Sequence, residues 1–200
     1  MKNHIYYSMF GFQRVGDQIW AAADQHVRGF LLGATAGRTT LGGEGLQHQD
    51  GTSHLIAATI PNCKAYDLGF ACELAVILDK GMQEMMLEQK DVFYYVTLMN
   101  ENYTQPDLVT GSEADIIRGC YSFKRFSAKD TAKRGEKSGT KEVTLMGSGA
   151  ILTEVVKAAQ QRGEQGVNAT VYSVTSWSEL ARDGAACQQA ALDGAKAAQL

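Results

Sequence analysis

The segment SAKDTAKRGEKSGTK, residues 127–141, places the tightest limit on how this chain can fold. It carries five basic and two acidic residues and no large apolar side chain. A segment of this composition cannot bury itself in a core and is typical of a solvated connector. We therefore predict one α/β part on each side of it. A basic tail for an anionic partner is the alternative interpretation of the same charges.

Two short apolar runs, GFLLGAT (residues 29–35) and VFYYVTLM (residues 92–99), precede this connector. Both are rich in strand-forming residues and lack strict alternation, which indicates strands covered on both faces. Two stretches show instead the spacing of an amphipathic helix. Their apolar stripes are Val15, Ile19, Ala22 and Ala23, and Phe70, Leu74, Ile77, Gly81 and Met85.

After the connector the sequence reads EVTLMGSG, AILTEVVKAAQQRGEQG, ATVYSV and SWSEL. This order predicts a strand, a glycine turn, a helix, a second strand and a short helix, which together make a βαβ unit and a parallel sheet. The GSG turn at residues 147–149 matches neither the dinucleotide-binding nor the P-loop spacing, so it favours a plain strand-to-helix turn over a phosphate loop. No strand follows, and we expect this second domain to be incomplete.

Charge and hydropathy exclude several classes of function. The net charge of −3 gives no reason to expect nucleic acid as a partner. No apolar run approaches the roughly 18 residues that span a bilayer, and the N-terminal residues lack the layout of a signal peptide. We therefore expect a cytoplasmic protein with no membrane partner.

Residues 35–54 form a long, glycine-rich connection that carries polar side chains. Long loops of this kind are usually functional or disordered, and glycine is kept where the backbone turns sharply or comes close to something. The candidate residues are Arg38, Glu44, His48, Asp50 and His54. The spacing of the two histidines and the aspartate allows metal binding or acid–base chemistry but is not a strong signature of either, and loop histidines are usually structural.

Two further stretches could contribute to a site. In YYSMFGFQRVGD, Tyr7 and Phe10 are three residues apart and could share one face, either as core or as a flat wall for a planar heterocycle. MNENYTQP, residues 99–106, ends a predicted strand with polar side chains. Ligands of parallel sheets gather at such carboxyl ends, although a capping turn explains the same residues.

Five segments, taken in order, resemble one family: YYSMFGFQRVGDQIWAAADQ, RGFLLGATAGRTTLGGEGLQHQDG, IPNCKAYD, FYYVTLMNENYTQP and YSVTSWSELARDG. It is the homodimeric pyruvate dehydrogenase E1 component, a thiamine diphosphate enzyme of the transketolase superfamily. The resemblance runs from about Ile5 to Gly184. It implies an α/β fold with parallel-sheet segments of two incomplete domains: a transketolase-like pyrimidine-binding domain (1–119), a connector (120–141) and a transketolase C-terminal domain (142–200).

The resemblance also implies roles for particular residues. Phe10 matches the family's phenylalanine that stacks on the aminopyrimidine ring of thiamine diphosphate, and Tyr7 matches the tyrosine beside it. His48 matches the active-centre histidine that faces the reacting thiazolium carbon. The family usually has HEDGHSH where this chain has HQDGTSH, so the resemblance assigns no role to Gln49 and Thr52.

For the parent protein, the resemblance implies oxidative decarboxylation of pyruvate and transfer of the acetyl group to the lipoyl group of E2, dihydrolipoyl acetyltransferase. It also implies a second E1 subunit as partner. The family's catalytic glutamate and its Mg²⁺-binding diphosphate domain match nothing in this chain, so we assign no metal ligand here and expect the chain alone to be inactive. A non-catalytic remnant that acts as an association module, or one chain of a split thiamine diphosphate enzyme, are the alternatives.

Overall fold

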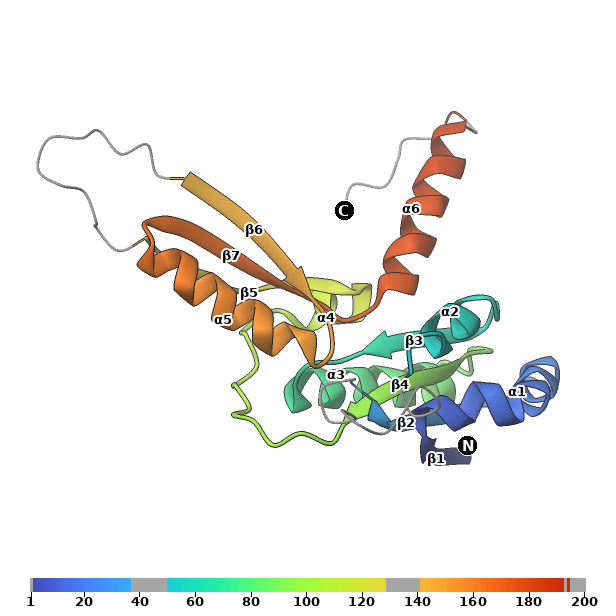
Figure 1. Cartoon of the computed structure of the whole chain (residues 1–200). Helices are drawn as coiled ribbons and strands as arrows, with labels where there is room; N and C mark the ends of the chain where they lie inside the picture. Colours follow the sequence, from blue (N-terminus) through green and yellow to red (C-terminus); the bar gives the residue numbers. More distant parts are fainter. Residues whose placement is uncertain (1, 37–49, 129–140, 193, 195–200) are drawn as a thin grey trace, which may run out of the picture.

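The computed structural model describes residues 2–36, 50–128, 141–192 and 194 of the chain. Two β-sheets form its frame (Figure 1). The first sheet has the order β1-β2-β4-β3, and the second has the order β5-β7-β6. We call the first sheet with its helices, up to residue 118, the first unit, and the later sheet with its helices the second unit.

The first sheet is parallel throughout and consists of β1 (Lys2–Tyr7), β2 (Gly29–Ala36), β4 (Phe93–Met99) and β3 (Cys63–Asp67). The central strand β4 is buried from Phe93 to Thr97. The prediction of strands covered on both faces is therefore confirmed for β2 and β4. The edge strands β1 and β3 were not predicted as strands from the residue pattern.

Helices cover both faces of the first sheet. α1 (Ser8–Asp24), which is interrupted at Val15, and α2 (Ser53–Ala58) share a core on one face. On the other face lie α3 (Ala71–Met82), the π-helix η3 (Gln83–Leu87) and α4 (Glu113–Arg118). The predicted helical stripes are confirmed at Ile19, Ile77 and Met85, which are buried in these cores. Phe70, the first residue of the second stripe, precedes α3 and packs instead in the core of the second sheet.

The second sheet consists of β5 (Cys120–Phe126), β6 (Lys141–Gly147) and β7 (Val167–Val174), with α5 (Ile151–Glu164) packed on it. The predicted parallel pair is confirmed as β6 and β7. β5, which pairs antiparallel with β7, occupies the first part of the expected connector. Its sequence CYSFKRF is half charged or polar, which hides a strand whose partner lies far along the chain. The domain bounds themselves stay a prediction.

The last helix, α6 (Trp177–Leu192), is longer than the short helix that the sequence suggested. It begins beside β3 and then rises away from both sheets (Figure 1). None of its residues is buried. No helix in the described ranges is both long and apolar enough to span a membrane.

Buried polar contacts join the two units. Glu73 is fully buried at the start of α3 and accepts four hydrogen bonds. Two come from the backbone N–H groups of Gly69 and Phe70. The other two come from the second unit, from the hydroxyls of Tyr121 (2.9 Å) and Ser173 (2.6 Å). Every lone-pair direction of this carboxylate is thus used, which makes its burial tolerable.

Candidate functional site

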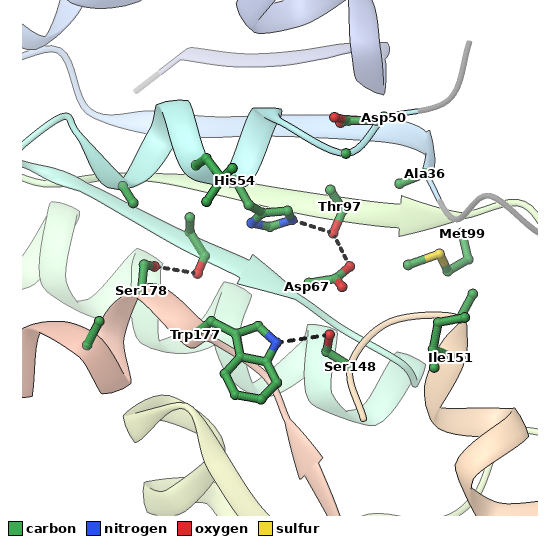
Figure 2. Close-up of a pocket in the computed structure, with 16 residues that line it drawn as sticks. Ala36, Asp50, His54, Asp67, Thr97, Met99, Ser148, Ile151, Trp177 and Ser178 are labelled. Atoms are coloured by element: carbon green, nitrogen blue, oxygen red, sulfur yellow. Dashed lines mark hydrogen bonds between the residues drawn. The ribbon is translucent and has the colours of Figure 1, made fainter. Parts of the chain in front are cut away.

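A cleft of about 610 Å³ lies between the units, where β2, β4 and β3 end (Figure 2). Carboxyl ends of neighbouring parallel strands are the usual place for ligands in sheets of this kind. The first unit contributes the polar wall, with Asp50, His54, Asp67 and Thr97. The second unit contributes Ser148, Ala150, Ile151, Trp177, Ser178 and Ala181. Neither unit forms this cleft alone.

Three side chains of the polar wall form a hydrogen-bonded row (Figure 2). The hydroxyl of Thr97 donates to Asp67 Oδ1 at 2.6 Å, and His54 Nε2 lies 3.1 Å from the same hydroxyl oxygen. Strand register sets up the row, because Asp67 and Thr97 are paired neighbours on β3 and β4. α2 then brings His54 over the end of the sheet.

The row determines which nitrogen of His54 carries its proton. The Thr97 hydroxyl has a single hydrogen, and of its two acceptors the Asp67 carboxylate at 2.6 Å is closer than the carbonyl of Tyr66 at 3.3 Å. Either acceptor directs this hydrogen away from the imidazole, and the free lone pair of Thr97 Oγ1 then suits a ring that donates from Nε2 and keeps Nδ1 as its basic nitrogen. Burial lowers the pKa of His54 below its ordinary value of 6.5, and the nearby charges of Asp67 and Asp50 oppose that shift.

Asp50 stabilises the start of α2, the helix that carries His54. Its Oδ1 accepts hydrogen bonds from the backbone N–H groups of Thr52 (3.2 Å) and Ser53 (3.1 Å), which have no helical partner at the start of the helix. Its Oδ2 accepts a hydrogen bond from the hydroxyl of Tyr95 at 3.3 Å. The Tyr95 ring in turn packs against the His54 ring, with centroids 5.0 Å apart. Asp50 therefore binds the start of α2 and, through Tyr95, the strand whose ring packs against His54.

The opposite wall of the cleft is more apolar. Trp177 Nε1 donates to Ser148 Oγ at 3.2 Å, and this hydrogen bond joins the start of α6 to the turn between β6 and α5. Trp177 and Ile151 remain more than half exposed at the rim (56% and 55%). The GSG turn is a strand-to-helix turn, as the sequence predicts: Gly147 ends β6, and the N–H of Gly149 donates to the carbonyl of Asp67 at 3.2 Å.

Of the residues expected from the resemblance, only the side chain of Phe10 is among those that the structure describes. Phe10 lies on α1, half-buried, with the Arg14 guanidinium 5.0 Å from its ring centre. It lines a second cleft, of about 530 Å³, between β1 and α1, which shares no lining residue with the first cleft. His48 and the side chain of Tyr7 lie outside the described part, so their placement relative to Phe10 stays a prediction.

The residue pattern found the site only in part. The sequence predicts a loop at His54, but this residue lies on α2, one residue after the helix begins. Asp67, Thr97 and Trp177 were not singled out. A strand-end position was the signal that could have found Asp67 and Thr97, but β3 itself was not predicted. Within residues 2–36, 50–128 and 141–192, no group of three His, Cys, Asp or Glu side chains could hold a metal ion.

Comparison with known families gives two matches. Residues 1–106 match the pyruvate dehydrogenase E1 component middle domain, and residues 130–200 match the transketolase-like TK C-terminal domain. Among solved structures, transketolase from Campylobacter jejuni has a TM-score of 0.69 at 16% identity and covers 90% of this chain and 25% of that one. A structure described as "Split gene transketolase, inactive beta4 tetramer" has a TM-score of 0.57 at 13% identity and covers 87% and 48%. The fold is thus the transketolase fold.

Curated relatives named pyruvate dehydrogenase E1 component are much closer in sequence. The protein from Pseudomonas aeruginosa is 52% identical over 187 residues, 93% of this chain, and the one from Escherichia coli is 50% identical over 188 residues. The chain spans only about a fifth of the length of these relatives (20% in both). Because the E1 middle-domain match covers residues 1–106 of 200, the chain belongs to the pyruvate dehydrogenase E1 component family.

Proposed function

We propose that this chain forms one part of the active centre of a thiamine diphosphate-dependent pyruvate dehydrogenase E1 component. The observation that carries the proposal is the polar row Asp67–Thr97–His54, placed at the strand ends of a chain from this family. The parent reaction would be oxidative decarboxylation of pyruvate with transfer of the acetyl group to the lipoyl group of E2. A cytoplasmic location and a second E1 subunit belong to the same proposal.

The described residues fit one half of the proposed cofactor. The ring of Phe10 lines the second cleft, which is separate from the cleft of the polar row, and an aromatic wall of this kind suits stacking of a planar pyrimidine. No cluster of metal-ligating side chains was found in the described residues, so we place neither the diphosphate nor its Mg²⁺ on them. When bound, thiamine diphosphate supplies the electron sink for decarboxylation of a 2-oxo acid.

The polar row supplies proton chemistry and orientation. His54 is neutral at pH 7 because burial lowers its pKa, and its Nδ1 can accept a proton while Nε2–H is held by Thr97. Asp67 and Asp50 stabilise the imidazolium that would form. In this proposal His48, predicted from the resemblance, would act beside His54 on the pyruvate-derived oxygen.

Calorimetric titration with thiamine diphosphate and Mg²⁺ tests this function. We expect the chain alone to bind no cofactor, and to bind it once it is mixed with a chain that supplies the diphosphate-binding domain. Phe10→Leu should weaken that binding at least tenfold, because it removes the stacking ring. Phe126→Leu, the same change on β5 of the second sheet, should leave it unaltered. Equal affinity in both variants would contradict the stacking role.

The similar structure described as an inactive tetramer of a split-gene transketolase favours a second candidate. In this alternative the chain is a separate subunit that associates with itself until a complementing chain arrives. Sedimentation of the purified chain distinguishes the two candidates, since a monomer at all concentrations argues against self-association. Pyruvate decarboxylation by the purified chain without any partner would refute our expectation that the chain alone is inactive.

A further inference from the structure

We infer that the second unit sets the position and the tautomer of His54 through Asp67, so that Asp67 and Thr97 are positioning residues for the imidazole. The relevance of this arrangement to catalysis rests on the proposed function, but the arrangement itself rests on contacts between described residues. Three steps lead from the second unit to the ring.

The first step is the backbone of Asp67. It is the last residue of β3, an edge strand, and the outward groups of an edge strand have no partner within their own sheet. The second unit supplies both partners. Asp67 N–H donates to the carbonyl of Thr175 at 2.9 Å, and the N–H of Gly149 donates to the carbonyl of Asp67 at 3.2 Å. The end of β3 is thus held from two sides.

The second step is the side chain of Asp67. Gly149 has a φ of +52°, and a Cβ atom placed there would lie 2.7 Å from both carboxylate oxygens of Asp67. Contacts that short do not occur, so a side chain at position 149 would have to displace the carboxylate or the turn. The absence of a side chain at Gly149 is therefore what permits the observed position of the Asp67 carboxylate.

The third step is the hydroxyl of Thr97. Its side chain is 3% exposed, so water does not compete for its hydrogen bonds. With the carboxylate in place, the hydroxyl hydrogen points to Asp67 and the oxygen accepts from His54 Nε2. If the carboxylate moved away, the hydroxyl hydrogen would be shared between the carbonyl of Tyr66, at 3.3 Å, and the ring. Donation to the ring would favour the Nδ1–H tautomer. Asp50, Asp67 and the ring of Tyr95 are the groups that face His54.

Nuclear magnetic resonance of the full 200-residue chain tests the inference without cofactor or substrate. Long-range ¹H–¹⁵N correlation spectra of histidine-labelled protein distinguish the two tautomers, and His54→Gln identifies the signal among four histidines. We expect His54 to carry its proton on Nε2. Thr97→Val, which keeps the shape but removes the hydroxyl, should shift the ring nitrogens of His54 toward the values of a tautomer mixture. Thr97→Ser should restore the wild-type signal.

The part played by the second unit is tested with a matched pair of glycine variants. Gly149→Ala should shift the ring-nitrogen signals of His54 although residue 149 does not touch the ring. Gly111→Ala, at a φ of +79° and with no atom within 4 Å of the added Cβ, introduces comparable backbone strain but no contact with Asp67 and should leave them unchanged. An Nδ1–H ring in the wild type, or identical His54 signals in the two glycine variants, would overturn the inference.

A Gly149→Ala chain that does not fold still gives an answer. If the added methyl group acts by displacing the carboxylate, then Asp67→Ala in the same chain removes the conflict and should restore folding, as seen by circular dichroism. Gly111→Ala gives the cost of the backbone strain alone, because φ is +79° there and the added Cβ meets nothing within 4 Å. If Gly111→Ala folds while the chain with both Gly149→Ala and Asp67→Ala does not, Gly149 acts without Asp67 and the inference is wrong. None of these measurements requires cofactor binding, so they test the inference separately from the proposed function.

Discussion

Glu84 shows, at the scale of single residues, how a charge can be held inside the first unit. Its side chain is 5% exposed and accepts hydrogen bonds from Lys64 (2.8 Å), Lys90 (3.2 Å) and the hydroxyl of Tyr94 (2.5 Å). Desolvation by burial alone raises the pKa of Glu84, but the hydrogen bonds from Lys64, Tyr94 and Lys90 and the charge of Lys64 outweigh it, and the pKa falls to about 2.

Glu84→Gln is expected to lower the free energy of unfolding by about 2–3 kcal/mol, because hydrogen bonds to a charged, buried acceptor are lost. The matched change Glu154→Gln removes only an exposed pair with Lys157 and should cost less than about 0.5 kcal/mol. Urea unfolding at pH 7 measures both. Since the folded pKa lies below the ordinary 4.5, wild-type stability should fall between pH 4.5 and 2, and less steeply in Glu84→Gln.

His54 gives a second pH dependence, at higher pH. Its folded pKa lies below 6.5 because the ring is buried, so the unfolded chain takes up the proton first as the pH falls. The free energy of unfolding should therefore decrease as the pH drops below about 6.5, the ordinary value for histidine. Urea unfolding between pH 7.5 and 5.5 measures this slope. His54→Gln should flatten it, and His4→Gln, at an exposed residue of β1, should not.

At the scale of elements, strands made of long apolar runs could be predicted from the sequence, whereas short strands that contain polar residues could not. Helices cover both faces of β4, so its residues are mostly apolar on both faces. The run FYYVTLM is therefore enough to predict a buried strand. CKAYD of β3 and CYSFKRF of β5 contain charged residues, and their pairing depends on strands far along the chain. The same difference applies to the site. His54 is a candidate from its residue type alone, whereas Asp67 meets Thr97 only because β3 pairs with β4 in one particular register.

Two helical glycines provide opposite tests of packing. A Cβ atom on Gly81 of α3 would lie 2.6 Å from the ring of Phe30, inside the core, whereas one on Gly184 of α6 meets nothing within 4 Å. Gly81→Ala should destabilise the protein by about 1–3 kcal/mol through overpacking. Gly184→Ala should be neutral or stabilise the helix by up to about 1 kcal/mol. Thermal unfolding followed by circular dichroism measures both, and a stabilised Gly81→Ala would contradict the close approach of α3 to β2.

At the scale of the whole molecule, the two units are joined by polar atoms that are buried on both sides. Glu73 of the first unit accepts from Tyr121 and Ser173 of the second, and Ser176 Oγ donates to the carbonyl of Ala65 at 2.6 Å. Tyr121 also packs into the apolar core of the first unit. Leaving such groups unpaired is costly, so the units should unfold together.

Removing the charge of Glu73 should separate the two units. The chain has two tryptophans, Trp20 on α1 and Trp177 on α6, so Trp177→Phe and Trp20→Phe report on one unit each. Their fluorescence transitions in urea should coincide in the parent chain. Glu73→Gln should lower stability by about 2–3 kcal/mol and split the transitions. Glu142→Gln, which breaks an exposed ion pair with Arg125 inside the second unit, should leave them coincident; separate transitions before any change at Glu73 would contradict the coupling.

The shared cleft has a consequence for how such chains can diversify. Its walls come from both sides of residues 127–141, with Asp67 on one side and Trp177 on the other, and Gly149 lies against the Asp67 carboxylate. Recombination within residues 127–141 would combine one wall of the cleft with the other wall from a different protein. The turn at position 149 would then have to fit the side chain at position 67 of that protein. Exchange of either half between relatives should therefore succeed only where positions 67 and 149 travel as a compatible pair.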